Sequence, residues 1–168
     1  MGQNHAADDL ASFTWFFTAE YPAVARLLTV VLRDAQAAED LAQEAFVRLH
    51  RNWSRISAYD SPEAWVRRVA LNLAFSWRRR EGRRHSLERT FEPPGTDPAQ
   101  ADIGVDIRRA VAALPQRERA LVALYHLEDR PISEVADVLG MSAGAVKVGL
   151  HRARHRLADM LQDRETTT

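Results

Sequence analysis

The segment PISEVADVLGMSAGAVKVGLHRARHRL (131–157) has the residue spacing of two short helices joined by a tight turn. Ala136 is small at the position where two such helices cross closely. Gly140, four residues later, suits a turn that needs a positive φ. Ser142 can cap a second helix. The segment therefore predicts a helix-turn-helix with helices over 133–139 and 142–162.

The second of these helices combines an apolar stripe (Val146, Leu150, Ala153 and Leu157) with a cationic face. A helix in the major groove presents its early residues to base edges and its later cations to phosphates. An ordinary helical hairpin with a solvated cationic face is the alternative, and the agreement of five spacing constraints argues against it. The candidates for base contact are Lys147, Val148 and His151, and those for backbone contact are Arg152, Arg154 and Arg156.

Helical periodicity extends over most of the remaining chain, and no strand-like alternation persists for more than a few residues. Ser61 and Pro62 supply an N-cap and a first-turn proline for one of these helices. The fold class is therefore predicted to be all-α. The expected helices are 8–32, 35–50, 62–80, 103–114 and 117–127, and 51–60 is expected to be a loop.

The stretch FEPPGTDPAQA (91–101) contains three prolines and a glycine, which predicts an extended linker. The length of 168 residues allows one domain or two small ones. We therefore expect a first helical domain over 8–90, a linker over 91–101 and a second helical domain over 102–163.

The formal net charge is zero, with 23 basic and 23 acidic residues, but the charges are unevenly distributed. Residues 1–64 carry five arginines against nine acids, a net of −4. Residues 65–91 carry eight arginines against two acids, a net of +6. The zero total is a cancellation between blocks, so it does not argue against a nucleic-acid partner.

Several classes of protein are disfavoured by composition. The chain has no cysteine, which removes disulfides, thiolate zinc sites and cysteine nucleophiles. The sequence contains no run of about 18 apolar residues that would predict a membrane span. Its polar first nine residues do not resemble a signal peptide. We therefore expect a cytoplasmic protein without membrane insertion. His151 and His155 could ligate a metal, but they lie among arginines and lack a carboxylate at metallopeptidase spacing. We therefore expect no catalysis, no catalytic or metal-binding residues and no cofactor.

The predicted helix 62–80 carries an apolar stripe and, beside it, a face on which aromatic residues alternate with arginine and an amide. Single-stranded nucleic acid is bound by such faces, because bases stack on rings and guanidiniums bind phosphates. A core position for the aromatic residues, with solvated arginines, is the alternative. The residues of this face are Trp65, Arg68, Asn72, Phe75, Ser76 and Arg79.

The predicted helix 35–50 presents an acidic surface beside Phe46. Such a surface with an aromatic anchor suits a basic protein partner. A solvated acidic helix is the alternative. The acidic surface contains Glu39, Asp40, Gln43 and Glu44.

Taken in order, these motifs resemble the extracytoplasmic-function (ECF) sigma factors of bacterial RNA polymerase, which belong to the sigma-70 family. The resemblance covers most of residues 10–161. Besides the helix-turn-helix, the matching strings are AEDLAQEAFVRLHRNW (38–53), AWVRRVALNLAFSWRRR (64–80) and ALPQRERALVALYHLE (113–128).

The resemblance implies a region 2 domain and a region 4 domain joined by a flexible linker, with core RNA polymerase, promoter DNA and an anti-sigma factor as partners. Asp40, Gln43, Glu44 and Phe46 would dock on the clamp of the largest polymerase subunit. The loop 52–61 would capture a flipped base of the −10 element. Region 4 would read the −35 element and bind the flap of the second largest subunit. Residues implied in −10 binding and melting are Trp65, Arg68, Asn72, Ser76 and Arg79, and those in −35 binding are Lys147, Val148, His151, Arg152 and Arg154.

The recognition helix departs from the usual family pattern, Gly-Thr-Val-Lys/Arg-Ser-Arg, at Ala145, Val148 and Gly149. We therefore expect weaker phosphate anchoring or an altered −35 preference. A stand-alone helix-turn-helix regulator is the alternative function, but it leaves the acidic helix and the face around Trp65 unexplained.

Overall fold

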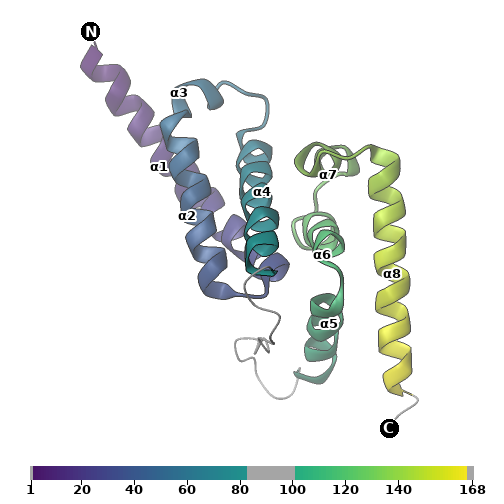
Figure 1. Ribbon diagram of the computed structural model, residues 1–168. Helices are drawn as coiled ribbons and strands as arrows, with labels where there is room; N and C mark the ends of the chain where they lie inside the picture. The colour runs from purple at the N-terminus through teal and green to yellow at the C-terminus, as the bar shows by residue number, and fades with distance from the viewer. Residues whose placement is uncertain (1, 83–100, 166–168) are drawn as a thin grey trace.

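The computed structural model describes residues 2–82 and 101–165, and in these two ranges its regular elements are all helices (Figure 1). The predicted all-α class is confirmed. Most of the predicted linker lies outside the described residues. The elements are α1 (Gly2–Leu32), α2 (Ala35–Arg51), α3 (Trp53–Ile56), α4 (Pro62–Gly82), α5 (Ala101–Ala113), α6 (Gln116–Val122), the π-helical turn η1 (Ala123–Leu127), α7 (Ile132–Leu139) and α8 (Ala143–Glu165).

The helix boundaries follow the capping residues of the sequence. Ser61 Oγ accepts a hydrogen bond from Ala64 N at 3.2 Å at the start of α4. Ser142 Oγ accepts one from Ala145 N at 3.1 Å at the start of α8. Gly140 has φ 63°, the left-handed conformation that the turn between α7 and α8 requires. The predicted helix-turn-helix is confirmed.

The segment 51–60 is not a simple loop, because it contains the short helix α3. Trp53 and Ile56 are buried, and Trp53 Nε1 donates a hydrogen bond to Ser12 Oγ at 2.8 Å. Trp53 also packs edge-on against Phe13 of α1. Burial of these two apolar side chains stabilises a turn of helix in a stretch whose local sequence lacks helical periodicity.

Helices α1, α2 and α4 pack as a bundle that forms the N-terminal half (Figure 1). The C-terminal part of α1 supplies Val24, Leu27, Leu28 and Val31, all buried as the periodicity predicted. The window Ala7–Leu32 of α1 is also long and apolar enough to cross a membrane, contrary to the sequence-based expectation. The apolar residues in the C-terminal part of α1 pack in the core of this bundle, whereas Leu10 and Trp15 in its N-terminal part are exposed.

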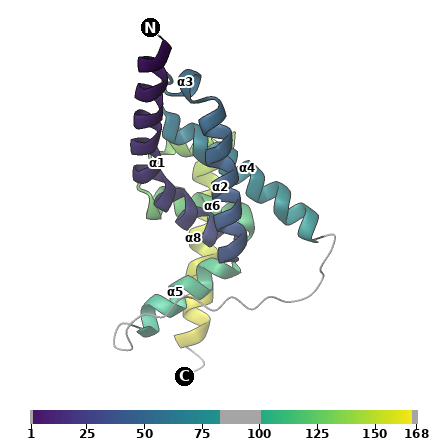
Figure 2. The same cartoon turned by 90° about the vertical axis from the view of Figure 1, so that its left-hand side faces the viewer.

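In the C-terminal half α6 and α7 pack against α8 (Figure 1), and α5 crosses α8 (Figure 2). Val146 and Leu150 of α8 are buried in the main core, with Val135 of α7. Ala153 of α8 packs in a smaller cluster with Leu114 and Val122.

The two halves pack against each other, and buried residues of both belong to one hydrophobic cluster. Helix α4 packs against α1 and α2 on one side and against α7 on the other (Figure 1). It therefore has a second buried face, which contains Arg67, Leu71, Ala74 and Phe75. The placement of Phe75 on an exposed nucleic-acid face was wrong, because this side chain is buried and Arg117 lies over its ring.

Candidate nucleic-acid and protein-binding surfaces

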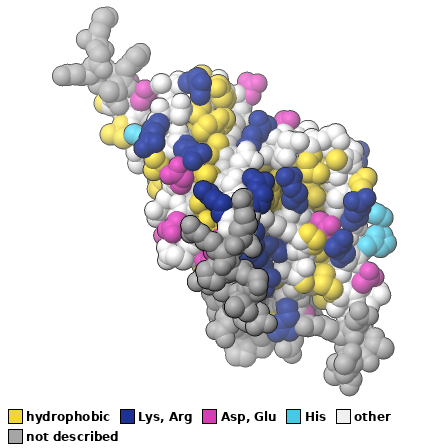
Figure 3. Space-filling model, in the orientation of Figure 1, with side chains coloured by type: hydrophobic (Ala, Val, Ile, Leu, Met, Phe, Trp, Pro, Cys, Tyr) yellow, Lys and Arg dark blue, Asp and Glu magenta, His cyan; other side chains and the backbone are white. Residues whose placement is uncertain are grey.

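The cationic face of α8 is exposed as the sequence predicted. Lys147, His151, Arg152 and Arg154 all lie on the surface, and Val148 is 50% exposed. Val146, Leu150 and Ala153 anchor the opposite side of the helix in the core. Figure 3 shows Lys and Arg side chains spread over both halves, with His side chains at the edge formed by α8. We call Lys147, Val148, His151, Arg152 and Arg154 the α8 cationic face.

Gly149 has a packing reason that the sequence did not show. A Cβ atom at this position would lie 2.5 Å from Cδ1 of Leu121 in α6. Leu121 is itself buried, so the missing side chain lets α8 approach α6 closely. Glycine in place of the arginine of the family pattern therefore allows α8 to pack closely on α6.

The predicted nucleic-acid face of α4 is only partly free. Asn72 and Arg79 are exposed, whereas Trp65 and Ser76 are half-buried. Arg79 Nη2 donates to Ser76 Oγ at 3.1 Å. Arg68 Nε donates to the main-chain oxygen of Asp137 at 2.9 Å, and its Nη2 donates to the same atom. We call Trp65, Arg68, Asn72, Ser76 and Arg79 the α4 face.

The polar residues predicted for docking on α2 lie on the surface, with Asp40 and Gln43 exposed and Glu44 half-buried. Gln36 Nε2 donates to Asp40 Oδ1 at 3.1 Å. Arg48 forms an ion pair with Glu44 at 2.8 Å. We call Asp40, Gln43 and Glu44 the α2 acidic face.

Phe46 is not the exposed anchor that the sequence predicted, because only 2% of it is exposed. Its ring lies against the rings of Phe16, Phe17 and Tyr21 of α1, with centroid separations of 6.4, 5.1 and 5.4 Å. Phe46 therefore holds α2 on α1.

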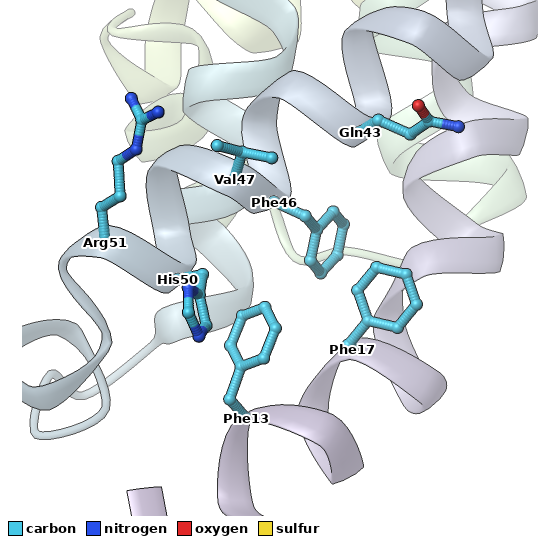
Figure 4. Close-up of a pocket in the computed structure, with 7 residues that line it drawn as sticks. All are labelled: Phe13, Phe17, Gln43, Phe46, Val47, His50 and Arg51. Carbon is cyan, nitrogen blue, oxygen red and sulfur yellow. The ribbon is translucent and has the colours of Figure 1, made fainter. Parts of the chain in front are cut away.

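An apolar pocket of about 480 Å³ lies between α1 and α2, next to the α2 acidic face (Figure 4). His50 packs edge-on against Phe13, with ring centroids 4.7 Å apart. Gln43 stands at the rim, so the pocket and the acidic face are parts of one surface. The lining residues are Phe13, Phe17, Gln43, Phe46, Val47, His50 and Arg51.

A buried arginine that the sequence analysis missed connects the two halves. Arg67 of α4 is 1% exposed. Its Nη1 lies 2.8 Å from Glu20 Oε2 of α1, and its Nε lies 2.5 Å from Glu128 Oε2, just after η1. Burial alone would lower the pKa of Arg67, but attraction to Glu128 and Glu20 outweighs it and raises the pKa. The guanidinium is therefore held charged between both halves.

Arg119 of α6 is a second buried arginine across the same junction. Its Nη2 and Nε donate to the main-chain oxygen of Val31, at 2.8 and 3.2 Å, near the end of α1. Its Nη1 donates to the main-chain oxygens of Leu114 and Ala112. Burial, with the nearby charges of Arg33 and Arg78, lowers the pKa of Arg119 to about 10. It still carries its charge at neutral pH.

The signal for Arg67 was present in the sequence. Leu71, Ala74 and Phe75 follow Arg67 at spacings of four, seven and eight residues, which places an arginine on an apolar helix face. Arg119 has no comparable signal, because its acceptors are main-chain oxygens. Among the residues whose surroundings the structure describes, no group of three or more potential ligands could hold a metal ion.

An all-α fold that combines an exposed cationic helix-turn-helix with an acidic helix defines a class of protein that binds DNA together with a protein partner. Comparison with family models gives the particular family. Residues 16–84 match the model of sigma-70 region 2, and residues 104–157 match the model of sigma-70, region 4. The chain belongs to the ECF sigma factors of the sigma-70 family and is an RNA polymerase sigma factor.

Curated relatives support this assignment over most of the chain. The chain is 31% identical to the RNA polymerase sigma-E factor of Streptomyces coelicolor over 94% of this chain and 90% of the relative. It is 36% identical to the ECF sigma factor SigF of Caulobacter vibrioides, over 74% of this chain and 70% of the relative. It is also 32% identical to the probable sigma factor RfaY of Xanthomonas campestris over 86% of this chain, but it spans only 39% of that protein.

A solved structure has a similar fold. The sigma factor RpoE of Bartonella quintana, in complex with the anti-sigma factor NepR, superposes with a TM-score of 0.75 and 21% sequence identity. The match covers 90% of this chain and 97% of that chain.

Proposed function

We propose that this sigma factor binds core RNA polymerase, directs it to promoters through a −10 and a −35 element, and assists melting of the DNA. The observation that carries the proposal is the presence of three surfaces, one on each of α2, α4 and α8, in a chain whose halves match regions 2 and 4 in that order. One chain can then hold polymerase and contact two promoter elements.

The α8 cationic face is proposed to read the −35 element as duplex DNA. Lys147, Val148 and His151 lie on the first turns of α8, where a recognition helix meets base edges. Arg152 and Arg154 follow at positions suited to phosphates. Because these contacts are largely to charged phosphates, affinity for the −35 element should fall steeply as salt rises.

The α4 face is proposed to bind the −10 element where the strands separate. The exposed side chains of Asn72 and Arg79 offer an amide for a base edge and a guanidinium for a phosphate. Trp65 presents part of a ring for stacking. The segment 52–61 is proposed to take the flipped base, whose unstacking costs a few kcal/mol.

The α2 acidic face, with the pocket beside it, is proposed to dock on the clamp of the largest polymerase subunit. Asp40 and Glu44 give the negative charge that a basic partner complements. The apolar pocket gives that partner an anchor site. Phe46 fixes α2 on α1 and also lines this pocket, so a side chain that enters the pocket would contact it.

The assignment to the ECF sigma factors also bears on the domain bounds, the further partners and the location of the protein. We propose a region 2 domain over 8–90, a linker over 91–101 and a region 4 domain over 102–163, in agreement with the matched ranges 16–84 and 104–157. Region 4 would also bind the flap of the second largest subunit. We further propose a cytoplasmic protein that catalyses no reaction, uses no cofactor and is held inactive by an anti-sigma factor, as RpoE of Bartonella quintana is crystallised with NepR.

Run-off transcription with purified core polymerase tests the proposal. The expected result is a transcript that requires both this chain and a promoter upstream of the start site. The alternative, a stand-alone helix-turn-helix regulator, predicts dimers that bind duplex DNA and add no transcript to core polymerase. Absence of a chain-dependent transcript from every template tried would exclude the sigma function.

A further inference from the structure

We infer that Val148 makes α8 select a thymine in the −35 element, through contact between its isopropyl group and the C5-methyl group of that base. The inference rests on the proposed function, because it names the base that one residue of the α8 cationic face reads. The family pattern has serine at this position, so the selection belongs to this chain rather than to the family pattern.

The direction in which Val148 points is fixed by the buried side of α8. Val146 and Leu150, two residues before and two residues after Val148, are buried in the main core. At about 100° per residue, this spacing places Val148 about 180° from the middle of the buried stripe. Half of the Val148 side chain is exposed. Val148 therefore points away from the core, and α8 forms one edge of the molecule (Figure 1).

The first turn of α8 leaves room for Val148 to reach the base edges. Gly144 lies four residues before Val148, which places it on the same face of the helix one turn earlier. The nearest atom to a Cβ built at Gly144 is Ser142 Oγ, at 3.9 Å. Ala145 adds only a methyl group, at an exposed position. Because glycine and alanine precede Val148 on this side, the backbone of the first turn can approach a groove closely.

A valine discriminates between bases only through apolar contact, because its side chain has no hydrogen-bond donor or acceptor. In the major groove, guanine, adenine and cytosine present nitrogen or oxygen atoms, whereas thymine also presents an apolar group, its C5-methyl. Covering a polar edge with valine removes water from a donor or acceptor without replacing the hydrogen bond, which is unfavourable. Contact with the thymine methyl group buries apolar surface on both partners. Val148 therefore favours thymine over the other three bases.

The serine of the family pattern would not make the same selection. Its hydroxyl both donates and accepts, so it can bond to the edge of any base. The exposed neighbours Lys147 and His151 also carry polar nitrogen atoms. Among the members of the α8 cationic face, the apolar contact is thus confined to Val148, and one thymine of the −35 element is read through it.

Replacement of thymine by uracil tests the inference with the full chain in the holoenzyme. Uracil lacks the C5-methyl group and keeps the Watson–Crick pairing. The probe is a promoter selected by run-off transcription from templates randomised upstream of the start site, with each thymine of the upstream block replaced in turn, on both strands. At one position the affinity of the holoenzyme, measured by competition binding, should fall about fourfold, the value of one buried methyl group. Uracil outside the selected blocks is the template control and should have no effect.

The variant Val148→Ser assigns the effect to this side chain. It replaces the apolar group with the residue of the family pattern, and serine and valine have similar helix propensities. Holoenzyme with this variant should bind the thymine and uracil templates equally. Ala158→Ser, at an exposed position roughly three turns further along α8, is the matched control and should keep the fourfold difference. Both positions are exposed, so thermal unfolding should give both variants the wild-type melting temperature.

Three results would overturn the inference and leave the sigma function standing, because each is obtained on a template that gives a chain-dependent transcript. The first is a selected upstream block with no thymine on either strand. The second is equal affinity for the thymine template and every uracil template, and the third is a uracil effect that persists with Val148→Ser. Absence of a chain-dependent transcript from every template would overturn the sigma function, and this inference with it.

Discussion

At the scale of single residues, side chains that the sequence predicts to have the same role differ in how exposed they are. Phe46 and Asp40 were both expected to contact a partner, but Phe46 lies in the core and Asp40 on the surface. Trp65 and Phe75 were placed on one face, and only Trp65 remains partly exposed. A helical wheel gives the angle of a residue around its own helix, and it does not show how many neighbouring helices pack on that helix.

We predict that Phe46→Ala destabilises the fold rather than acting on binding alone. The large side chain fills a site among three aromatic rings, so its truncation should lower the free energy of unfolding by about 3–5 kcal/mol. Urea denaturation measures this change, with Val47→Ala as the control at an exposed neighbour. A loss below about 1 kcal/mol would contradict the burial of Phe46.

Gly149 gives a second prediction at this scale. Gly149→Arg restores the family residue, but its Cβ would overlap Leu121, so the free energy of unfolding should fall by about 1–3 kcal/mol. Ala145→Thr restores another family residue at an exposed position and should leave stability almost unchanged. Thermal unfolding of both variants checks the pair. Equal melting temperatures would show that the close approach of α8 to α6 is not a constraint.

At the scale of helices, the sequence predicted most element boundaries, because capping residues and apolar periodicity are local signals. For helix α4 the prediction of the buried surface was incomplete. Its wheel predicted one apolar stripe, whereas the structure buries a second face that includes Arg67 and Phe75. Glu128 and Arg117, which contact Arg67 and Phe75 of that face, are far away in sequence, so local periodicity could not reveal it. The exposed cations of α8 were predictable, because α8 packs through a single stripe.

The α2 acidic face can be tested with variants that keep the core intact. Asp40→Ala combined with Gln43→Ala removes exposed groups only, so affinity for core polymerase should fall roughly tenfold or more while stability stays within about 0.5 kcal/mol. Competition binding against a labelled sigma factor measures the affinity. Asp9→Ala, an exposed acid on α1, is the control. Unchanged affinity in the double variant would place the docking site elsewhere.

Substitutions on the α4 face should cause a different defect from those on the α2 acidic face. Asn72→Ala combined with Trp65→Ala should reduce promoter opening more than core binding, because these side chains are proposed to contact DNA at the point of strand separation. Permanganate footprinting on the holoenzyme measures the opening. Since Trp65 is half-buried, thermal unfolding must accompany the footprint. Equal losses of opening and core binding would argue against a role in melting.

At the scale of the whole molecule, the zero net charge is the sum of an acidic block over residues 1–64, a basic block over 65–91 and the remainder of the chain. The acidic first block contains the α2 acidic face, and the following block contains the α4 face and most of the arginine excess. Of the arginines that the structure describes, Arg67 and Arg119 are buried, and both connect the two halves. The surface charge of each half therefore differs from the total, and one arginine of the α4 face, Arg68, donates to the main-chain oxygen of Asp137 in α7.

We propose that this chain recognises two promoter elements as part of a polymerase holoenzyme. Transcription by core polymerase with this chain, from a pool of templates randomised upstream of the start site, tests this recognition. Selection for run-off transcripts should enrich two short sequence blocks at a fixed separation, and changing Lys147, Val148 and His151 to alanine should relax only the upstream block. Enrichment of one palindromic block, or of none above the background of core polymerase alone, would contradict it.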